Sequence, residues 1–339
     1  MRTKDPKLLL QPAPILRQGM TTPTAMRDVL LALMPALIAG SWFFGLGALL
    51  VVAASIAGAL ATEWLFTPPQ RRAQAIGDNS ALLTGLLLGM TLPPALPLWM
   101  AFIGGMTAIG LGKIIWGGLG TNLFNPALLG RAFLLGTFPI AMTTWTEPGA
   151  AFFDLPSSLL AWPFQSPVYD AVASATPLGL MKFEHKGSDF LNLLIGNTGG
   201  SLGETSGLLL ILGGLYLGWR RDLDWRIPAA ILIAAVLFSG ILYAVDPGKF
   251  PGPLFTLFAG GFWLGTLFMA TDPVTSPLTP RGAWIFGLGV GFLVVLIRVF
   301  GGFPEGMMYA ILLMNAATPL IDRYTQPRVF GRGREGKAP

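Results

Sequence analysis

The stretch "VLLALMPALIAGSWFFGLGALL", residues 29–50, decides the fold, because it carries no charged side chain over a length that could cross a bilayer. A transmembrane helix needs about 20 predominantly apolar residues. A second stretch of the same character, "AAILIAAVLFSGILYAV", occupies residues 229–245. Together they predict a helical protein that crosses a membrane several times.

The composition of the whole chain supports this class. Of 339 residues, 53% are hydrophobic and 12% are charged, whereas soluble domains carry about 25% charged residues. The 44 glycines and 28 prolines favour close helix packing and broken helices. The absence of cysteine excludes disulfides and thiolate iron–sulfur ligation within this chain, and a single histidine, His185, excludes a multi-histidine metal or haem site.

The hydropathy pattern predicts an all-α polytopic membrane protein with about ten transmembrane helices. The 78–92 range is short and runs into Pro93-Pro94, so we expect a broken helix there. The predicted parts are a cytoplasmic segment 1–27 with no cleaved targeting peptide, a first five-helix unit 28–143, a loop 144–204, a second unit 205–321 and a tail 322–339. The ten ranges are 28–45, 47–66, 78–92, 96–116, 124–143, 205–219, 227–245, 254–270, 283–300 and 304–321.

The distribution of basic residues predicts the orientation, since cytoplasmic loops carry an excess of Lys and Arg. With both termini cytoplasmic, 17 basic residues lie inside and four outside, and the 144–204 loop faces the outside. We therefore interpret the net charge of +5 as a topology signal, and we expect no nucleic-acid partner. The inside set is Arg2, Lys4, Lys7, Arg17, Arg27, Arg71, Arg72, Lys113, Arg220, Arg221, Arg226, Arg281, Arg323, Arg328, Arg332, Arg334 and Lys337. The outside set is Lys182, Lys186, Lys249 and Arg298.

An internal repeat with an offset of 185 residues relates the two units. Trp99 and Lys113 match Trp284 and Arg298, and proline-rich turns, "TLPPALPLW" and "SPLTPRGAW", lead into both tryptophans. Five predicted helices separate the copies, so the second copy would be inverted in the membrane, as in transporter and channel folds. Chance similarity between glycine- and proline-rich apolar segments is the alternative, because the identities are few.

The loop contains "YDAVASATPLGLMKF", residues 169–183, in which small residues separate Asp170 from Thr176. Small side chains let another molecule approach closely. The Thr176 hydroxyl is a possible attachment point for a phosphoryl group, although a threonine hydroxyl is a weak nucleophile that needs help from elsewhere. An ordinary loop and helix start accounts for the same residues.

Within that stretch, "DAVASAT" resembles the flavinylation motif, roughly Asp-Gly-x-Ser/Thr-Gly-Ala-Thr. Asp170, Ala175 and Thr176 match it, whereas Ala171, Ala173 and Ser174 depart from it. Four further stretches resemble the NqrB/RnfD family, and its RnfD branch more than its NqrB branch. They are "SALLTGLLLGMTLPP", "GGLGTNLFNPALLGR", "FMATDPVTSPLTPRG" and "GGFPEGMMYAILLMNAATPLIDRYTQPRVFG".

The resemblance implies a fold of two inverted repeats similar to that of urea and ammonium transporters. It implies FMN joined by a phosphodiester to Thr176 through an external flavin transferase, with Asp170, Ser174 and Ala175 completing the motif. It also implies a second, non-covalent flavin, riboflavin or FMN. By the same resemblance the chain is one component of an inner-membrane complex of the Rnf type, with the A, B, C, E and G subunits as partners and membrane lipid around it. That complex couples electron transfer between ferredoxin and NAD to Na⁺ or H⁺ translocation.

A few polar residues in or near the predicted spans are further candidates. Arg131 lies inside the fifth range, where a charge is costly, so it should face a flavin, a lipid headgroup or a carboxylate, or else snorkel from a helix end. Four carboxylates near the span ends serve either a cation path or helix capping and interfacial solvation: Glu63, Asp78, Asp272 and Glu305. Asn122 and Asn125 hydrogen-bond across the repeat interface or to a ligand, or else cap a helix.

Three functions follow from these features. The first is a flavin-bearing subunit of an ion-translocating electron-transfer complex, which is not catalytic alone. The second is a small-solute transporter or channel without a cofactor, and the third is a scaffold for other subunits. The Asp170-to-Thr176 stretch favours the first function, because a plain channel has no need of it.

Overall fold

The computed structural model describes residues 21–149, 151–163, 175–184, 187 and 189–327, and within this part of the chain there is no β-strand. The α-helices of the first part are α1 (Thr22–Phe66), α2 (Arg72–Gly77), α3 (Ser80–Met90), α4 (Leu98–Ile109), α5 (Pro126–Thr137) and α6 (Pro139–Thr143). After these come α7 (Pro177–Gly179), α8 (Phe190–Ile195), α9 (Gly207–Arg220), α10 (Arg226–Val245), α11 (Pro253–Phe258), α12 (Phe262–Leu264), α13 (Pro280–Phe300) and α14 (Met307–Thr325).

Short 3₁₀- and π-helical turns extend or connect these helices. The 3₁₀ turns are η1 (Pro69–Arg71), η3 (Ser157–Leu160) and η5 (Leu202–Glu204), and the π-helical turns are η2 (Gly110–Ile114), η4 (Leu180–Glu184) and η6 (Gly265–Met269). Turns of the π type inside α-helices are frequent at functional sites. Here η2 continues α4, η4 continues α7 and η6 continues α12.

The 45 residues of α1 form two helical segments joined by a sharp kink. At 1.5 Å per residue a straight helix of this length would span about 68 Å, roughly twice the hydrocarbon thickness of a bilayer. Gly45 makes the kink with a φ of 75°, which favours glycine. The next residue, Leu46, donates its freed backbone N–H to the carbonyl of Phe152, so a distant loop segment completes the bend.

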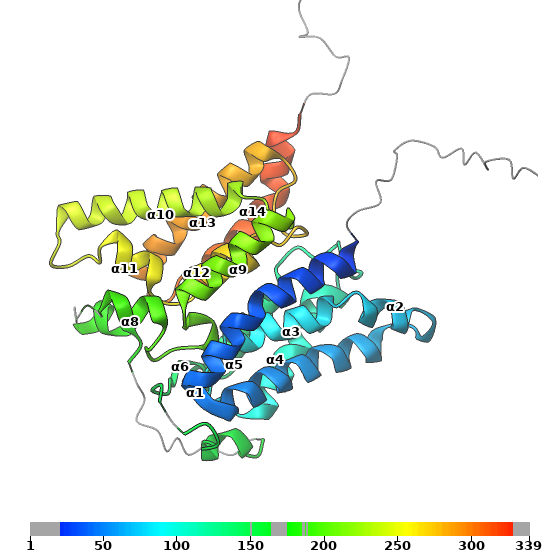
Figure 1. Cartoon of the computed structure of the whole chain (residues 1–339). Coiled ribbons are helices and arrows are strands. Elements are labelled where there is room, and N and C mark those ends of the chain that lie inside the picture. The colour runs from blue at the N-terminus through cyan, green and yellow to red at the C-terminus, as the bar shows by residue number, and fades with distance from the viewer. Residues whose placement is uncertain (1–20, 150, 164–174, 185–186, 188, 328–339) are drawn as a thin grey trace, which may run out of the picture.

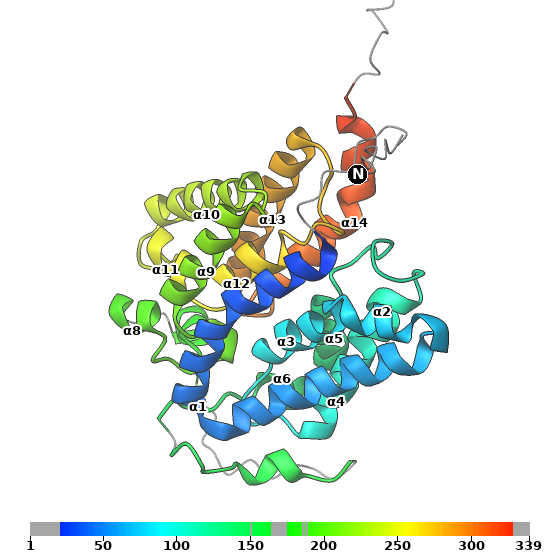
Figure 2. The ribbon, with the colours of Figure 1, turned by 45° about the vertical axis from the view of Figure 1, so that its right-hand side comes forward.

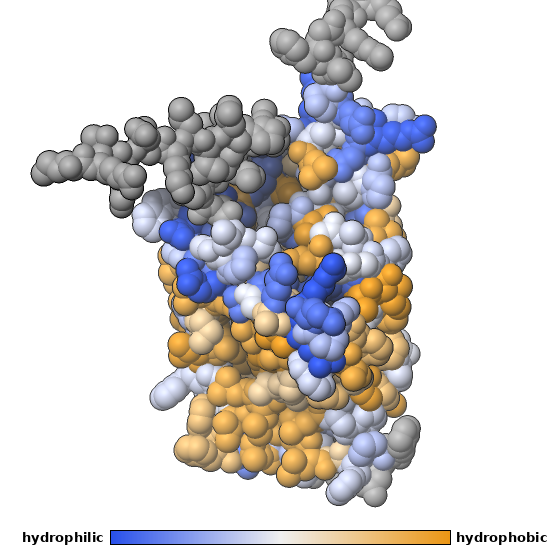
Figure 3. Space-filling view, turned by 90° about the vertical axis from the view of Figure 1, so that its right-hand side faces the viewer, coloured by the Kyte–Doolittle hydropathy of each residue, from blue (hydrophilic) through white to orange (hydrophobic). Residues whose placement is uncertain are grey.

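In the described part of the chain, three helices are long and apolar enough to cross a membrane, namely α1, α10 and α13. Their outward sides carry exposed large hydrophobic residues, such as Trp42, Leu237 and Phe292, which suit contact with lipid. Figure 3 shows a broad hydrophobic surface on one face of the molecule, with hydrophilic residues gathered toward one end. These observations support the expected helical membrane protein.

Several other helices are broken, as the proline and glycine content predicts. The short helix α3 stops at Met90, and a turn containing Pro93-Pro94 separates it from α4. In the second half, α11 ends at Phe258, and irregular backbone at 259–261 leads into α12 and η6. Gly260 lies in the middle of this break with a φ of 68°. Broken helices at membrane depth require that neighbouring groups satisfy the freed backbone atoms.

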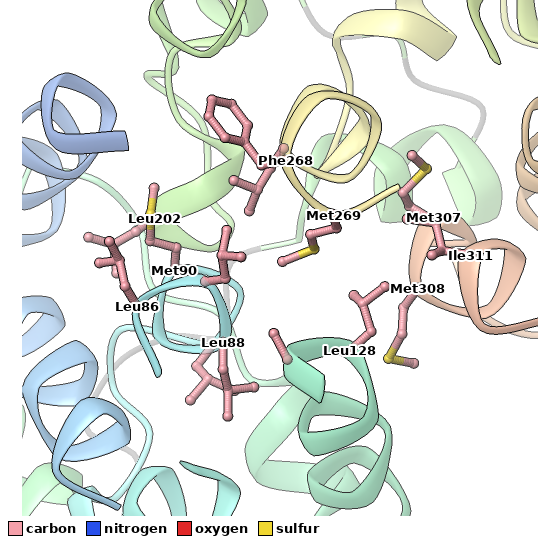
Figure 4. Packing of buried hydrophobic residues seen from close by; sticks show 14 of the residues in the cluster. Leu86, Leu88, Met90, Leu128, Leu202, Phe268, Met269, Met307, Met308 and Ile311 are labelled. Carbon is pink, nitrogen blue, oxygen red and sulfur yellow. The ribbon is translucent and has the colours of Figure 1, made fainter. Parts of the chain in front are cut away.

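The helices form two groups on either side of the first segment of α1 (Figures 1 and 2). In one group α1 packs against α3 and α4, and α4 packs against α5; in the other, α10 packs against α11 and α13, and α13 against α14. Contacts between α1 and α9 and between α5 and α14 join the groups. The core between them is apolar, with Leu88, Met90, Leu128, Met269 and Met307 converging from both groups (Figure 4).

Candidate functional site

Thr176 is the N-cap of the short helix α7. Its side-chain Oγ1 accepts a hydrogen bond from the backbone N–H of Gly179 at 3.2 Å, and its carbonyl accepts from Leu180. Threonine followed by proline suits this position, because proline is favoured at the first helical residue and threonine is an effective cap. The sequence predicted a threonine displayed on a loop, but only 8% of the Thr176 surface is exposed, while the neighbouring Ala175 is exposed.

The turn that carries Thr176 is anchored on the broken helix of the second half. Leu178 packs in a small apolar cluster with Leu193 and Ala259. A side chain at Gly260 would meet the end of Leu178, since a Cβ there would lie 2.5 Å from Leu178 Cδ1. Glycine at this position therefore allows the Thr176 turn to lie directly on the helix break.

Arg298, from the last turn of α13, reaches the same break. Its guanidinium donates to the carbonyl of Thr256 at 2.5 Å and to that of Ala259 at 2.9 Å, which satisfies backbone groups freed where α11 ends. The side chain is buried, and its Nε atom has no hydrogen-bond partner. The sequence assigned Arg298 only a topological role, whereas the structure makes it a buried cation beside the Thr176 turn.

A cavity of about 240 Å³ opens next to Arg298 and Leu178. Its wall is largely apolar and includes the rings of Phe183, Phe250 and Phe255. Two lysines, Lys182 and Lys249, also line it, so three cations share one cavity. Sequence reasoning missed this cluster, because its members lie on three segments that are far apart in the chain.

Two contacts tie the two helix groups together at the centre of the molecule. Asn125 caps α5 by accepting from the backbone of Ala127 and Leu128, and its amide donates to the carbonyl of Met269 at 3.1 Å. The Asn125 side chain is thus both a helix cap and a link between the two helix groups. The sequence had offered these two roles as alternatives.

The second contact is an ion pair between Arg131 and Glu305, with an N–O distance of 2.5 Å. Arg131 is buried within α5, so it does not snorkel from a helix end, and its partner is one of the carboxylates singled out from the sequence. A flavin contact for Arg131 stays a prediction. Glu305 lies beside Gly261, where a Cβ would also come within 3.9 Å of Glu204, a carboxylate that the sequence did not single out.

A third cluster lies on the other side of the first group. Lys113 donates to both carboxylate oxygens of Glu63, at 2.7 and 2.9 Å, and to Ser80 Oγ at 2.7 Å. Asp78 accepts from the N–H and hydroxyl of Ser80 and lies 3.7 Å from Lys113. Lys113 and Arg298, which the repeat pairs, are therefore both buried basic residues with several partners.

The remaining candidates are not brought into one site. Asp272 accepts from Val274 and Thr275 in the turn between η6 and α13, where it caps no helix. Asn122 is buried with its amide oxygen unpartnered. Asp170, Ser174 and His185 lie outside the described residues. Of the proposed flavin motif, the structure thus describes Ala175 and Thr176.

Comparison with known proteins gives the family. The model of the NQR2, RnfD, RnfE family matches residues 9–331, which is nearly the whole chain. The chain belongs to this family.

Individual relatives of this family cover almost the full length. The chain is 44% identical over 320 residues to the D subunit of a proton-translocating ferredoxin:NAD(+) oxidoreductase complex from Clostridium ljungdahlii, covering 91% of this chain and 92% of that one. It is 42% identical over 337 residues to the D subunit of an ion-translocating oxidoreductase complex from Stutzerimonas stutzeri, covering 92% and 93%. It is 39% identical over 328 residues to the D subunit of a Na(+)-translocating ferredoxin:NAD(+) oxidoreductase complex from Acetobacterium woodii, covering 96% and 95%.

Proposed function

We propose that this chain is the membrane-embedded D subunit of an ion-translocating electron transport complex and that it carries FMN covalently on Thr176. The observation that carries the proposal is the family match over residues 9–331, together with relatives named as the D subunits of such complexes. The chain is not catalytic alone. It acts with the A, B, C, E and G subunits of an Rnf-type complex, and with a flavin transferase that matures it.

The residues of the Thr176 turn fit an attached flavin phosphate. Thr176 supplies the hydroxyl oxygen, and the neighbouring Ala175 is exposed, so another molecule can approach. The unpartnered Nε of Arg298 and the lysines of the adjacent cavity supply positive charge on the same side of the turn. FMN, when attached, takes up and passes on electrons, while the protein sets its position and surroundings. The family resemblance is the sole support for a second, non-covalent flavin, riboflavin or FMN.

The finer architecture is part of the proposal. An inverted repeat of two five-helix units is supported by the matched packing of α1 with α4 and of α10 with α13. Trp99 and Trp284 lie near the starts of α4 and α13, and the paired cations Lys113 and Arg298 lie near the other ends. We infer ten crossings from the same arrangement, with α1 supplying two of them.

We also propose that the protein lies in the bacterial inner membrane with both termini cytoplasmic and the Thr176 turn outside. The charge distribution supports this orientation. The arrangement in Figure 1 agrees with it, since the blue start of α1 and the red end of α14 point to the same side, while α8 lies toward the opposite side. A flavin transferase that works outside the cytoplasm could then reach the turn.

The function can be tested in inverted membrane vesicles from cells that contain the complex. Reduced ferredoxin should drive NAD⁺ reduction and ion uptake into these vesicles, and Thr176→Ala should abolish both while the complex still assembles. Thr176→Ser, which keeps a hydroxyl, is the matched control and should retain part of both activities. Full electron transfer and ion uptake in the assembled Thr176→Ala complex would contradict the proposal.

A further inference from the structure

The cavity beside the Thr176 turn combines an apolar, partly aromatic wall with three positive charges. Arg298, Lys182 and Lys249 line it, and no Asp or Glu stands among its described lining residues. Cavities that bind small molecules are typically apolar with a few placed polar groups. The apolar wall and the excess of cations in this cavity point to an occupant that is largely apolar and negatively charged in at least one state.

Arg298 is the strongest sign of a missing partner. It is only 7% exposed and bonds to two neutral backbone carbonyls, while its Nε atom has no partner. Among the described residues no carboxylate forms a salt bridge with it; Glu204 and Glu305 attract it electrostatically from a longer distance. A buried charge is costly unless it is paired, so an anion in the cavity would offset part of that cost.

The two lysines are less buried than Arg298, since Lys182 is half-buried and Lys249 is exposed. Lys182 donates to the carbonyls of Gly301 and Phe303, and burial lowers its pKa, because no anion compensates for its lost hydration. Lys249 lies over the ring of Phe250, with its Nζ 5.6 Å from the ring centroid. Neither lysine forms an ion pair with a described residue, so all three cations remain available to a bound anion.

The position of the cavity identifies the occupant. Leu178 forms part of the wall and follows Thr176 by two residues, so their Cα atoms are at most about 7 Å apart. A group tethered to the Thr176 hydroxyl therefore starts at the edge of the cavity, where tethering gives it a high effective concentration. A free lipid headgroup would have no such advantage.

We propose that this cavity holds the isoalloxazine ring of the flavin attached to Thr176, with Arg298, Lys182 and Lys249 facing its N1–C2 carbonyl edge. The inference rests on the proposed function. Two electrons and one proton convert the neutral oxidised ring into the reduced ring that bears one negative charge at this edge. Nearby cations stabilise the anionic form over the neutral one, so they raise the midpoint potential of the attached flavin.

The test is a redox titration of the full-length chain, purified in detergent after production together with the flavin transferase. Dithionite is the reductant and water supplies the proton. The variants are Arg298→Gln, Lys182→Gln and Lys249→Gln, and Arg281→Gln is the control, since it removes a charge from the far end of α13, about 25 Å away. In-gel flavin fluorescence reports covalent loading, and Thr176→Ala gives the background from any non-covalent flavin.

We expect normal covalent loading in all four variants. Arg298→Gln should reduce the preference for the reduced ring about tenfold, which is about 30 mV for a two-electron couple. Lys182→Gln and Lys249→Gln should shift the potential in the same negative direction, and Arg281→Gln should leave it unchanged. Arg298→Gln loses the bonds to Thr256 and Ala259 and could fail to accumulate. In that case the potentials of Lys182→Gln and Lys249→Gln test the inference.

Normal loading with unchanged potentials in the cavity variants would overturn the inference and leave the proposed function standing. If those variants lose a co-purifying anionic phospholipid and their potentials are again unchanged, the cavity binds a lipid. That result would also overturn the inference. No flavin fluorescence in the parent chain, with active transferase, would overturn the proposed function and this inference together.

Discussion

Arg131 on α5 forms a mostly buried ion pair with Glu305, which precedes α14, is itself half-buried and lies 174 residues later in the chain. The pair joins the two helix groups at the centre of the molecule, next to the helix break at Gly261. Removing one partner of a buried pair typically costs about 3–5 kcal/mol, because the other charge is left uncompensated.

Arg131→Met should therefore destabilise the protein by a few kcal/mol, since it leaves Glu305 without its cation and close to another acidic residue, Glu204. The double variant Arg131→Met/Glu305→Met should recover most of that loss, because no unpaired charge remains. Thermal unfolding of the detergent-solubilised chain measures both effects. A double variant as unstable as the sum of its single variants would show that the two side chains do not interact.

Asn125 offers a separate test of the same interface. Asn125→Ala removes the cap of α5, worth about 0.5–2 kcal/mol, and also leaves the buried carbonyl of Met269 without its donor. In Asn125→Ser the serine can still cap α5, but its side chain is too short to donate to the Met269 carbonyl as the asparagine amide does. We expect the order of unfolding temperatures to be parent, then Ser, then Ala. A Ser variant as stable as the parent would mean that the bond to Met269 adds nothing.

Glycine permits the closest helix contact in the first group. A Cβ at Gly58 of α1 would lie 2.0 Å from the carbonyl oxygen of Phe102 of α4, so Gly58→Ala must push the two helices apart. We expect a loss of at least about 1–3 kcal/mol, as for other overpacked interiors. Gly136→Ala is the matched control, because Gly136 lies in α5 with nothing within 4 Å. Thermal unfolding should show the control equal to the parent or slightly more stable.

Asp222, in the turn between α9 and α10, should make stability depend on pH. Burial raises the pKa of its carboxyl, the negative charge of Asp28 raises it further, and neither carboxylate oxygen has a hydrogen-bond partner. The folded protein therefore holds this proton more tightly than the unfolded chain does. Its stability falls as pH rises from the unfolded pKa, about 4, through the raised folded value.

Asp222→Asn removes this dependence. The variant should unfold at a higher temperature than the parent at pH 7.5, and the difference should shrink as pH falls and disappear below about pH 3, where Asp222 is protonated in both states. Asp224→Asn, in the same turn but only half-buried and paired with Arg226, is the control and should show no such gain. An advantage for Asp222→Asn that grows as pH falls would contradict this reasoning.

Much of the fold could be predicted from the sequence, because the length of an apolar segment and a proline-rich turn can both be recognised from neighbouring residues. The 78–92 range is broken off before Pro93-Pro94, as expected, and the kink that separates 28–45 from 47–66 is at Gly45. The 254–270 range was expected to be one helix, but the structure breaks it at 259–261, where no proline signals the break. The number of crossings and the inverted repeat stay predictions. The partners of buried charges could not be read from the sequence, since Arg131 and Glu305, or Arg298 and Thr256, meet only through tertiary packing.

The candidate site was partly predictable for the same reason. Thr176 followed by Pro177 predicts a helix start, and the structure has one there. The residues around Thr176 do not indicate that its side chain is mostly buried. They also do not indicate that Leu178 and Arg298 both lie next to Gly260. The cationic cavity draws Lys182, Lys249 and Arg298 from three separate segments. Their shared location is a property of the folded chain, and the sequence alone assigned them only to one side of the membrane.

The most direct measurement is the mass of the peptide that contains Thr176, after production of the chain with an active flavin transferase. Trypsin releases this threonine within residues 132–182, by cleavage after Arg131 and Lys182. We predict a mass increase equal to FMN less one water, located on Thr176 by fragmentation and lost in Thr176→Ala. An unmodified peptide at full recovery, with the transferase shown to be active on another substrate, would contradict the claim that this chain carries covalent FMN.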